Sequence, residues 1–280
     1  MLTFLFWNLK RGPRLENVAR LVERHGVDVL MLAESTLGIG ETLIRLNSGG
    51  RSAFHYNAGN CERVAVFSKL DGRRMRPIVE DEHVSIRRAR PVSGDDILLA
   101  VAHLRSRLHQ SDDSQTLAAT SVANLIARAE RKVGHTRTLL VGDLNMDPFD
   151  HGVVAAGCLH ATMDRRIAAA GARSVGGKAY SFFYNPMWSM LGDASPGPPG
   201  TYYHRRSEHI AYFWHMFDQA LLRPALLPLF SNQDISILDT DGVGPFVKGR
   251  SGAPDVRVAS DHLPILFRLT HPGVAHEQVQ

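Results

Sequence analysis

The sequence Ser-Asp-His-Leu-Pro-Ile at residues 260–265 places Asp261 directly beside His262 at the end of a predicted strand. A carboxylate and an imidazole in this position can hold a metal ion and a general base side by side. Three earlier stretches also set a polar residue directly after an apolar run: Phe6-Trp7-Asn8, Leu32-Ala33-Glu34 and Gly142-Asp143-Leu144-Asn145. Together the four stretches predict that residues far apart in the chain meet on one rim.

The composition indicates an ordinary globular protein. The chain has 280 residues, of which 44% are hydrophobic and 21% charged, and its middle contains nothing that resembles a linker. We therefore expect a single domain with an extensive core over residues 1–270, followed by a loose tail over residues 271–280.

Charge, cysteines and targeting signals narrow the class of protein further. An excess of 32 Lys and Arg over 28 Asp and Glu permits a polyanionic partner but does not require one. Cys61 and Cys158 stand far apart and are expected to be buried free thiols. The sequence lacks a secretory leader, a glycosylation sequon and the apolar run of ~20 residues that spans a bilayer. These features predict a cytoplasmic protein with no membrane span.

Residues 2–33 are predicted to form a strand, a helix and a second strand. Leu2 to Trp7 is uniformly apolar, as in a strand that is buried on both faces. Leu15, Val18, Leu21 and Val22 recur at helical spacing before Gly26, and Val27 to Ala33 forms the next buried strand. Asn8 and Glu34 are expected to be exposed where these two strands end.

Further elements follow along the chain. A strand is expected at Arg63–Ser68, and a hairpin around Ser93–Asp96 should bring His103 and Arg105 to the end of its returning strand. The other expected elements are an amphipathic helix at Thr116–Val133, a short buried strand at Thr138–Val141, a loop-rich stretch at Gly171–Tyr203, and strands at Phe217–Leu222 and Leu263–Leu269.

Five residues at predicted strand ends have side chains of the type that magnesium prefers. Mg²⁺ takes oxygen ligands and keeps several waters, so one or two carboxylates and an amide suffice. The candidates are Glu34, Asp143, Asp261, Asn8 and Asn145. Asp and Asn after strands are also common turn formers, so each of them alone is a weak indication.

The order of the motifs resembles that of the endonuclease/exonuclease/phosphatase superfamily, which includes deoxyribonuclease I. The matching stretches are Phe6-Trp7-Asn8, Asp28-Val29-Leu30-Met31-Leu32-Ala33-Glu34, Val101-Ala102-His103-Leu104, Val141-Gly142-Asp143-Leu144-Asn145, Met216-Phe217-Asp218-Gln219 and Ser260-Asp261-His262-Leu263-Pro264. The resemblance implies an α/β (α+β) fold. This is a four-layered sandwich of two packed mixed or antiparallel sheets that are flanked by helices, with the active site on one edge.

The resemblance also implies roles for individual residues. Glu34 would be the principal metal ligand, helped by Asn8 and Asp261, with Mg²⁺ as the ion and Mn²⁺ as an alternative. His262 would be a general base or act directly at the phosphorus, and Asp218 would orient it. Asp143 and Asn145 would position the nucleophile and the phosphoryl oxygens. His103 would stabilise the transition state or protonate the leaving oxygen, and Arg105 or Arg88 would contact the phosphate.

Elementary chemistry agrees with these roles. A phosphodiester is anionic and repels hydroxide, so its hydrolysis needs a cation on the non-bridging oxygens, an activated water and help for the leaving oxygen. A metal ion, a His–Asp pair and a second His meet these three needs.

Other polar clusters have simpler explanations. His204, His209 and His215 fit no zinc-ligand spacing that is supported by Cys. The aromatic and Arg residues around them could stack bases and contact phosphates beside the rim, or could simply form an aromatic edge of the core. Arg87 to Arg90 is expected to lie mostly on the solvated surface. Asp112-Asp113 is expected to complement a helix dipole.

The leading hypothesis is a magnesium-dependent phosphodiesterase that acts on DNA or RNA. The alternatives are the same chemistry on a small or lipid phosphoester, as in an inositol phosphatase or a sphingomyelinase, and a binding module without catalysis. The sequence does not identify any protein partner.

Overall fold

The computed structural model describes residues 1–49, 53–106, 111–205, 207, 209–249 and 252–270. The predicted tail at residues 271–280 lies outside the described residues.

Two large sheets form the centre of the molecule, as predicted. In the order in which its strands pair, the first sheet contains β16 (Ile235–Ile237), β19 (Ile265–Leu269), β1 (Leu2–Asn8), β2 (Val29–Ala33), β4 (Val64–Ser68) and β3 (His55–Tyr56). The second contains β5 (Met75–Glu80), β6 (Val84–Ala89), β7 (Ile97–His103), β8 (Thr138–Asp143), β15 (Asp218–Leu222), β12 (Phe183–Tyr184) and β9 (Ala161–Thr162). Both sheets mix parallel and antiparallel pairs, which confirms the predicted fold class.

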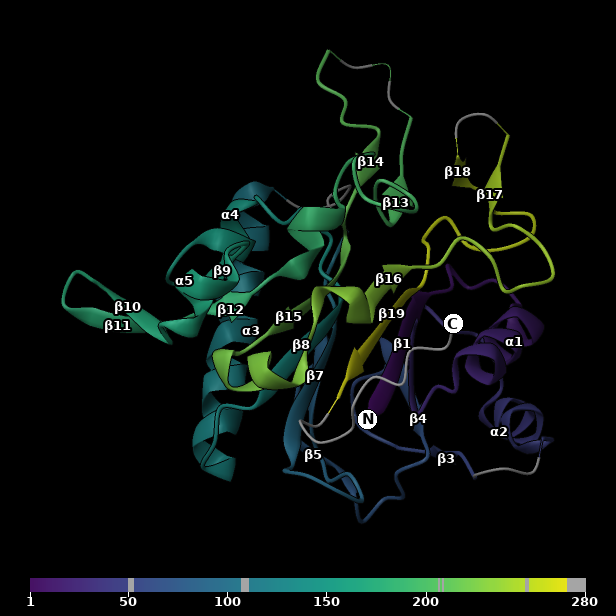
Figure 1. Ribbon diagram of the computed structural model, residues 1–280, viewed down its shortest axis with the longest axis horizontal. Helices are drawn as coiled ribbons and strands as arrows, with labels where there is room; N and C mark the ends of the chain where they lie inside the picture. The colour runs from purple at the N-terminus through teal and green to yellow at the C-terminus, as the bar shows by residue number, and fades with distance from the viewer. Residues whose placement is uncertain (50–52, 107–110, 206, 208, 250–251, 271–280) are drawn as a thin grey trace.

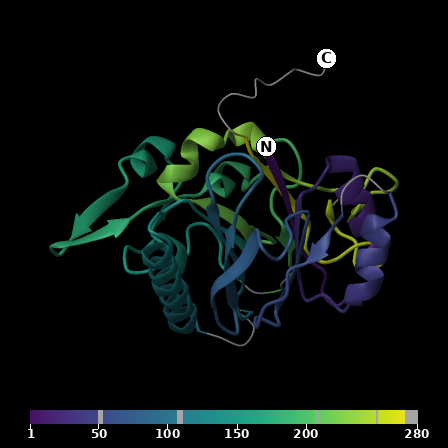
Figure 2. The same cartoon turned by 90° about the horizontal axis from the view of Figure 1, so that it is seen from below.

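Helices cover the outer faces of both sheets (Figures 1 and 2). The helices α1 (Leu15–His25) and α2 (Ile39–Asn47) lie on the side of the first sheet, and α3 (Asp112–Val133), α4 (His151–Val154) and α5 (Arg165–Ala169) lie on the side of the second. The short 3₁₀ helices are η2 (Pro186–Met190), η3 (Pro224–Leu229) and η4 (Asn232–Asp234).

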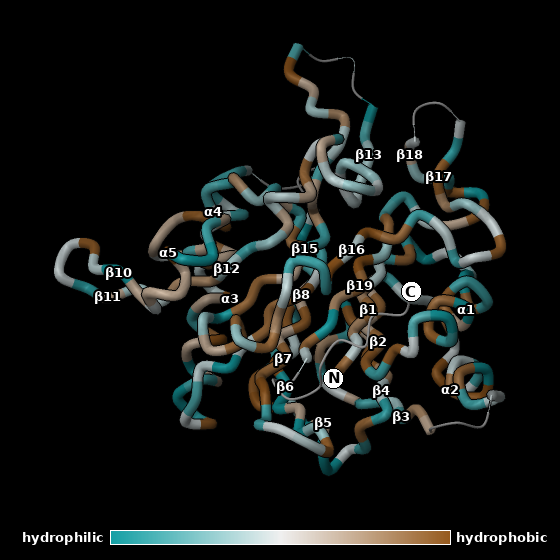
Figure 3. Tube along the Cα trace, in the orientation of Figure 1, coloured by the Kyte–Doolittle hydropathy of each residue, from teal (hydrophilic) through white to brown (hydrophobic). Residues whose placement is uncertain are grey.

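The central strands of the second sheet, β7 and β8, are buried on both faces because each face has its own core. In β7, Leu99 and Val101 belong to the larger core, whereas Leu98 and Ala100 alternate with them and belong to the core beneath α3. This two-residue alternation is what a pleated strand requires when both of its faces are covered. Figure 3 shows the hydrophobic residues gathered along these central strands.

Two strand–helix–strand units bring the functional residues to one rim. The strands β1 and β2 pair in parallel with Asn8 opposite Ala33, and β7 and β8 pair in parallel with His103 opposite Asp143. Strand β15 runs antiparallel to β8, so its first residue, Asp218, also lies opposite Asp143. Five segments of the chain therefore end or begin at the same edge.

Some elements and one burial prediction differ from expectation. The helix α2 was not predicted, and the loop-rich stretch contains the hairpin of β10 (Ala172–Val175) and β11 (Lys178–Ser181), which projects from the body in Figure 1. Asn8 was expected to be exposed but is buried, because the Lys10 backbone folds back onto its side-chain oxygen and its amide lies between Glu34 and Asp143. Cys61 and Cys158 are free and buried, as expected.

Gly142 allows β7 and β8 to approach each other just before Asp143, the last residue of β8. A Cβ atom at this position would lie 1.9 Å from the Ala102 carbonyl oxygen, which is a backbone atom that cannot rotate away. We expect Gly142→Ala to lower the free energy of unfolding by about 3 kcal/mol or more. Urea denaturation measures this change. Gly157→Ala is the matched control, because no atom lies within 4 Å of its added Cβ. Equal losses in the two variants would contradict the prediction.

Candidate active site

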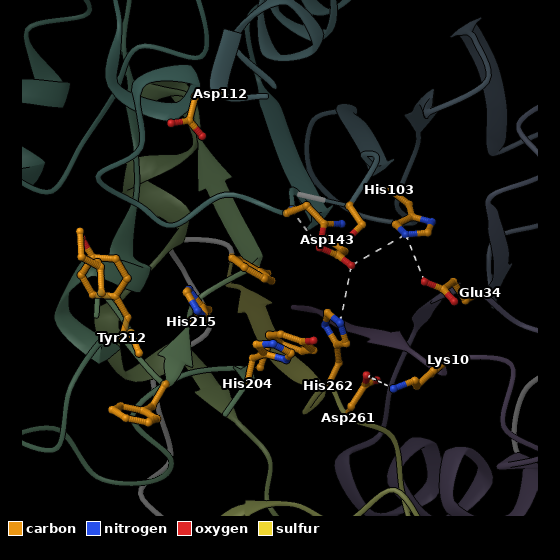
Figure 4. A pocket seen from close by; sticks show the side chains of 17 residues that line it. Lys10, Glu34, His103, Asp112, Asp143, His204, Tyr212, His215, Asp261 and His262 are labelled. Carbon is orange, nitrogen blue, oxygen red and sulfur yellow. Dashed lines mark hydrogen bonds and ion pairs between the residues drawn. The ribbon is translucent and has the colours of Figure 1, made fainter. Parts of the chain in front are cut away.

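The strand ends surround an open pocket of about 530 Å³. Glu34, His103, Asp143, Asp261 and His262 line one side of it (Figure 4). The structure thus brings together residues that lie more than two hundred positions apart in the sequence.

A buried histidine–aspartate pair forms the floor of the site. The His262 Nδ1 atom lies 2.8 Å from the Asp218 Oδ2 atom, and both side chains are buried. The Trp7 indole N–H donates to the His262 carbonyl oxygen at 2.9 Å and the Asp218 amide donates to the Thr201 hydroxyl at 3.1 Å, so the backbone on both sides is fixed.

The electrostatics of this pair favour an imidazolium. Burial opposes a charge on His262, but the Asp218 and Asp143 carboxylates outweigh it and raise the pKa of His262 to about 10. Burial also raises the pKa of Asp218 to about 6, although the neighbouring His262 opposes this rise. At neutral pH the pair therefore consists of a carboxylate and a protonated ring.

Asp143 is the central carboxylate of the site. Its Oδ2 atom accepts a hydrogen bond from the Asn8 amide at 2.9 Å, and its Oδ1 atom accepts one from the Asn145 backbone N–H at 2.9 Å. The His103 and His262 Nε2 atoms lie 3.8 Å and 3.9 Å from the same Oδ2 atom. Asp143 therefore stands between the two imidazoles, as the dashed lines in Figure 4 show.

Glu34 and His103 occupy the half-buried side of the pocket. The His103 Nε2 atom lies 3.5 Å from the Glu34 Oε1 atom, and the Asn8 amide donates to this same oxygen at 3.3 Å. Burial lowers the pKa of His103 against the opposing effect of Asp143 and Glu34, so this ring is neutral where His262 is charged. Glu34 has a φ of 45°, a left-handed conformation that is uncommon outside glycine and often found at functional sites.

Asn145 has a second left-handed backbone conformation, with a φ of 51°. Its side-chain amide donates to the Leu104 carbonyl at 2.9 Å, and its own carbonyl accepts from Gln115 at 2.7 Å. These bonds tie the end of β7, the loop after β8 and α3 together. They also keep the Asn145 backbone N–H on Asp143.

The acidic cluster could hold a divalent metal ion. Among the described residues, one group of three metal-ligating side chains has its ligand atoms within 4.8 Å of one another: Asp143, Asp218 and His262. In this group Asp218 and His262 bind each other, so the carboxylates that could face a metal ion are Asp143 and the neighbouring Glu34, which share the Asn8 amide. The side-chain Oδ1 atom of Asn8 already accepts the Lys10 backbone N–H at 3.0 Å. The Asn8 side-chain amide donates to both Glu34 and Asp143. An oxygen-rich donor set of this kind suits a hard cation.

The remaining predicted site residues lie at different distances from this centre. Asp261 reaches the pocket but forms an ion pair with Lys10. Arg105 lies on the exposed rim near Glu34, paired with Glu82. Arg88 is not brought to the site: it pairs with Asp96 near the start of β7, at the opposite end of the sheet. Its neighbour Arg87 is buried and pairs with Glu80.

Lys10 lines the pocket but was not predicted from the sequence, whereas the aromatic segment that contains Tyr202, Tyr212 and His215 was considered as a base-stacking surface. Lys10 was missed because its partner Asp261 lies 251 positions away. The wall opposite Glu34 contains Tyr202 and Tyr212, together with His215, whose Nδ1 atom lies 2.7 Å from the Asp147 Oδ2 atom. In the part of the chain that the structure describes, His204, His209 and His215 form no group that could hold a metal ion. Their place in the aromatic segment was the available signal.

Asp112, which was expected to complement a helix dipole, lies in the first turn of α3, and Ser111 caps this helix by accepting the Ser114 backbone N–H. The described helices include none that is both long enough and apolar enough to cross a bilayer.

Solved structures share this fold at low sequence identity. D. rerio TDP2 complexed with single strand DNA product is 16% identical, with a TM-score of 0.53 and coverage of 96% of this chain and 99% of that chain. The 3′ phosphatase NExo from Neisseria, bound to product DNA hairpin, is 14% identical, with a TM-score of 0.56 and coverage of 97% and 100%. An AP endonuclease from Archaeoglobus fulgidus is 12% identical, with a TM-score of 0.56 and coverage of 96% and 99%. At these identities the likeness establishes the fold alone.

Comparison with the curated proteins finds no significant match. The sequence pattern of the Endonuclease/Exonuclease/phosphatase family, however, matches residues 5–262, which includes every strand end that lines the pocket. The chain belongs to the endonuclease/exonuclease/phosphatase family.

Proposed function

We propose that this protein is a magnesium-dependent phosphodiesterase that cleaves DNA or RNA. The observation that carries the proposal is the position of Asp143, whose Oδ2 atom has an imidazole nitrogen on either side at 3.8 Å and 3.9 Å. One of these rings is held by the buried Asp218. The solved structures of similar fold include one with single strand DNA product and one with a product DNA hairpin, which supports a nucleic-acid substrate.

The different protonation states of His262 and His103 suit the two rings to different roles. His262 carries a proton at neutral pH, so it is suited to act directly at the phosphorus, where it neutralises a phosphoryl oxygen as negative charge develops. Asp143 is the carboxylate placed to orient the attacking water and accept its proton. Neutral His103 donates from Nε2 toward the anionic centre and stabilises the transition state or the leaving oxygen.

Glu34, Asp143 and Asp261 would hold the Mg²⁺ ion, and Asn8 keeps two of these carboxylates in place. When bound, the ion supplies positive charge to the non-bridging oxygens and lowers the pKa of a bound water. Arg105, on the exposed rim beside Glu34, is placed to contact a neighbouring phosphate of the substrate.

A panel of substrates tests the proposal. Purified protein is incubated with plasmid DNA, single-stranded DNA, RNA, sphingomyelin and inositol phosphates, with magnesium or with a chelator. We expect cleavage of one or more nucleic acids that stops in the chelator. Cleavage confined to sphingomyelin or inositol phosphates would overturn the nucleic-acid substrate, and no cleavage of any substrate would favour a binding module.

Replacing the Glu34 carboxylate tests its role as a metal ligand. We expect Glu34→Gln to raise the magnesium concentration for half-maximal rate by about 10-fold or more, because the amide keeps the size of the side chain but loses its charge. Glu41→Gln, in the first turn of α2, is the matched control and should leave the magnesium dependence unchanged. Overlapping magnesium titrations of the two variants would remove Glu34 from the metal site. Isothermal titration of magnesium gives a readout that does not depend on activity.

A further inference from the structure

The side of the pocket opposite Glu34 is built from rings, and the catalytic roles above do not use them. We call Tyr202, Tyr212, His215 and Phe217 the aromatic wall; all four line the pocket. The rings contact one another in sequence. Tyr212 lies 6.1 Å from His215, His215 stacks on Phe217 at 4.6 Å, and Phe217 stacks on Tyr202 at 5.2 Å.

The aromatic wall joins directly onto the catalytic pair. Tyr202 pairs through its backbone with His215 on one side and with His262 on the other. Its ring centroid lies 4.7 Å from that of His262 and 6.3 Å from that of His215. His215 is therefore two strand spacings from His262, or about 10 Å. This distance places His215 and Tyr212 to one side of the catalytic pair rather than in contact with it (Figure 4).

A buried carboxylate fixes the orientation of His215. Asp147 is 1% exposed, and its Oδ2 atom lies 2.7 Å from the His215 Nδ1 atom. Its Oδ1 atom accepts the Met216 backbone N–H at 2.8 Å, so it cannot turn away. Within the described residues the ring makes its hydrogen bond through Nδ1, which leaves Nε2 for a substrate. The Asp218–His262 pair on the floor of the site has the same arrangement, with a buried carboxylate on the histidine Nδ1 atom.

Tyr212 presents an aromatic surface to solvent beside this fixed imidazole. It is 62% exposed, and Phe149 supports it from behind with a centroid distance of 5.9 Å. An exposed ring that other rings hold in place can stack on a flat partner with little loss of conformational freedom. Inositol rings and acyl chains offer no such flat π surface, whereas every nucleobase does.

We propose that the aromatic wall is a subsite for one unpaired nucleotide next to the scissile phosphate. Its base stacks on Tyr212, and the Nε2 atom of His215, whose Nδ1–H donates to Asp147, accepts a hydrogen bond from an N–H or O–H group of that nucleotide. This inference rests on the proposed function and narrows the substrate to single-stranded or locally unpaired nucleic acid. A base that remains within a duplex stack has no free face for Tyr212.

The test measures stacking separately from cleavage. A single-stranded DNA with 2-aminopurine beside the scissile phosphate is titrated, in magnesium, with the Asp143→Asn variant, which slows cutting and leaves His262 in place beside Tyr202. We expect the fluorescence to be quenched as the base stacks. Adding Tyr212→Ala should weaken binding about ten-fold, as expected for the loss of one stacking ring. Tyr203→Ala is the matched control, because Tyr203 lies on the same hairpin but does not line the pocket.

His215 needs a variant that keeps the strand β14 (Trp214–His215) in place. His215→Gln retains an N–H donor for Asp147 but removes the ring. If His215 only stabilises the strand, this variant should bind the DNA as tightly as the protein that retains His215. We expect about ten-fold weaker binding of the same DNA with an unchanged melting temperature.

The possible results separate this inference from the proposed function. Loss of quenching with Tyr212→Ala but not with Tyr203→Ala supports the subsite. Three results would overturn it: equal fluorescence quenching by all variants, equal loss of quenching in Tyr212→Ala and Tyr203→Ala, or equally tight binding of a DNA strand that carries an abasic analogue in place of 2-aminopurine. Failure of the otherwise unmodified protein to hydrolyse the DNA or bis(p-nitrophenyl) phosphate would instead reject the proposed function.

Discussion

Replacement of Asp143 by asparagine is expected to lower kcat/KM for phosphodiester cleavage by about 10³-fold or more. The amide has the shape of the carboxylate but cannot accept the proton of the attacking water, and it removes the negative charge between His103 and His262. Loss of proton transfer alone costs typically 10²–10⁴-fold. Loss of the carboxylate also weakens the expected metal site. Loss of proton transfer and loss of metal binding therefore both raise the activation free energy of cleavage.

Asp143→Asn also has a clear control. Asp164 caps α5 on the other side of the second sheet, and asparagine is an equally good cap, so Asp164→Asn should retain full activity and stability. Initial rates on a single-stranded oligonucleotide, measured on proteins purified in parallel, give the comparison. Equal rates for Asp143→Asn and Asp164→Asn would mean that the activity comes from another site or from a contaminating nuclease.

Replacement of His262 by alanine is expected to lower kcat/KM by about 10²–10⁴-fold. The loss follows from the removal of the ring that Asp218 holds at 2.8 Å and that carries a proton at neutral pH. It should appear mainly in kcat, because the imidazolium is expected to interact most strongly as negative charge develops in the transition state.

His262→Ala is also expected to change stability, because it leaves the buried Asp218 without its partner. A second substitution at Asp218 provides the control. Without His262 the Asp218 carboxylate is buried and unpaired, which lowers the free energy of unfolding by about 3–5 kcal/mol. The double variant His262→Ala with Asp218→Asn removes that charge, so it should regain stability while its activity stays low. Recovery of activity together with stability would show that His262 has a structural role. Urea denaturation and initial rates on the same samples distinguish the two results.

The sequence predicted one half of the rim because Asn8, His103 and Asp143 end apolar strands and Glu34 directly follows one. The expectation that Asp261 and His262 end a strand was wrong: they precede β19, and Asp218 begins β15. His103 and Asp143 end two parallel strands in register, and the hydrophobic runs before them mark those strands in the sequence. The apolar face of α1 and its C-terminal end at Gly26 were also predicted from the sequence. Gly26 adopts the left-handed conformation that ends the helix. Local patterns of this kind are set by residues close together in the chain.

The parts that were missed depend on contacts between distant segments. The helix α2 has Ile44 at 77% exposed and a single fully buried residue, Thr42, so it lacks the buried stripe that marks a surface helix. The burial of Asn8 depends on Glu34 and Asp143, and the orientation of His215 depends on Asp147 across 68 positions. Arg88 was a candidate because of its charge, but the strand register carries it to the opposite end of the sheet.

The role of Asp143 in metal-dependent cleavage is tested by the rate at which the unmodified protein and Asp143→Asn cleave a single-stranded oligonucleotide, each in magnesium and in a chelator. We expect rapid cleavage in one condition only, the unmodified protein with magnesium, and a rate lower by about 10³-fold for Asp143→Asn in the same buffer. Cleavage by the unmodified protein that persists in the chelator, or equal rates for the two proteins in magnesium, would contradict this expectation.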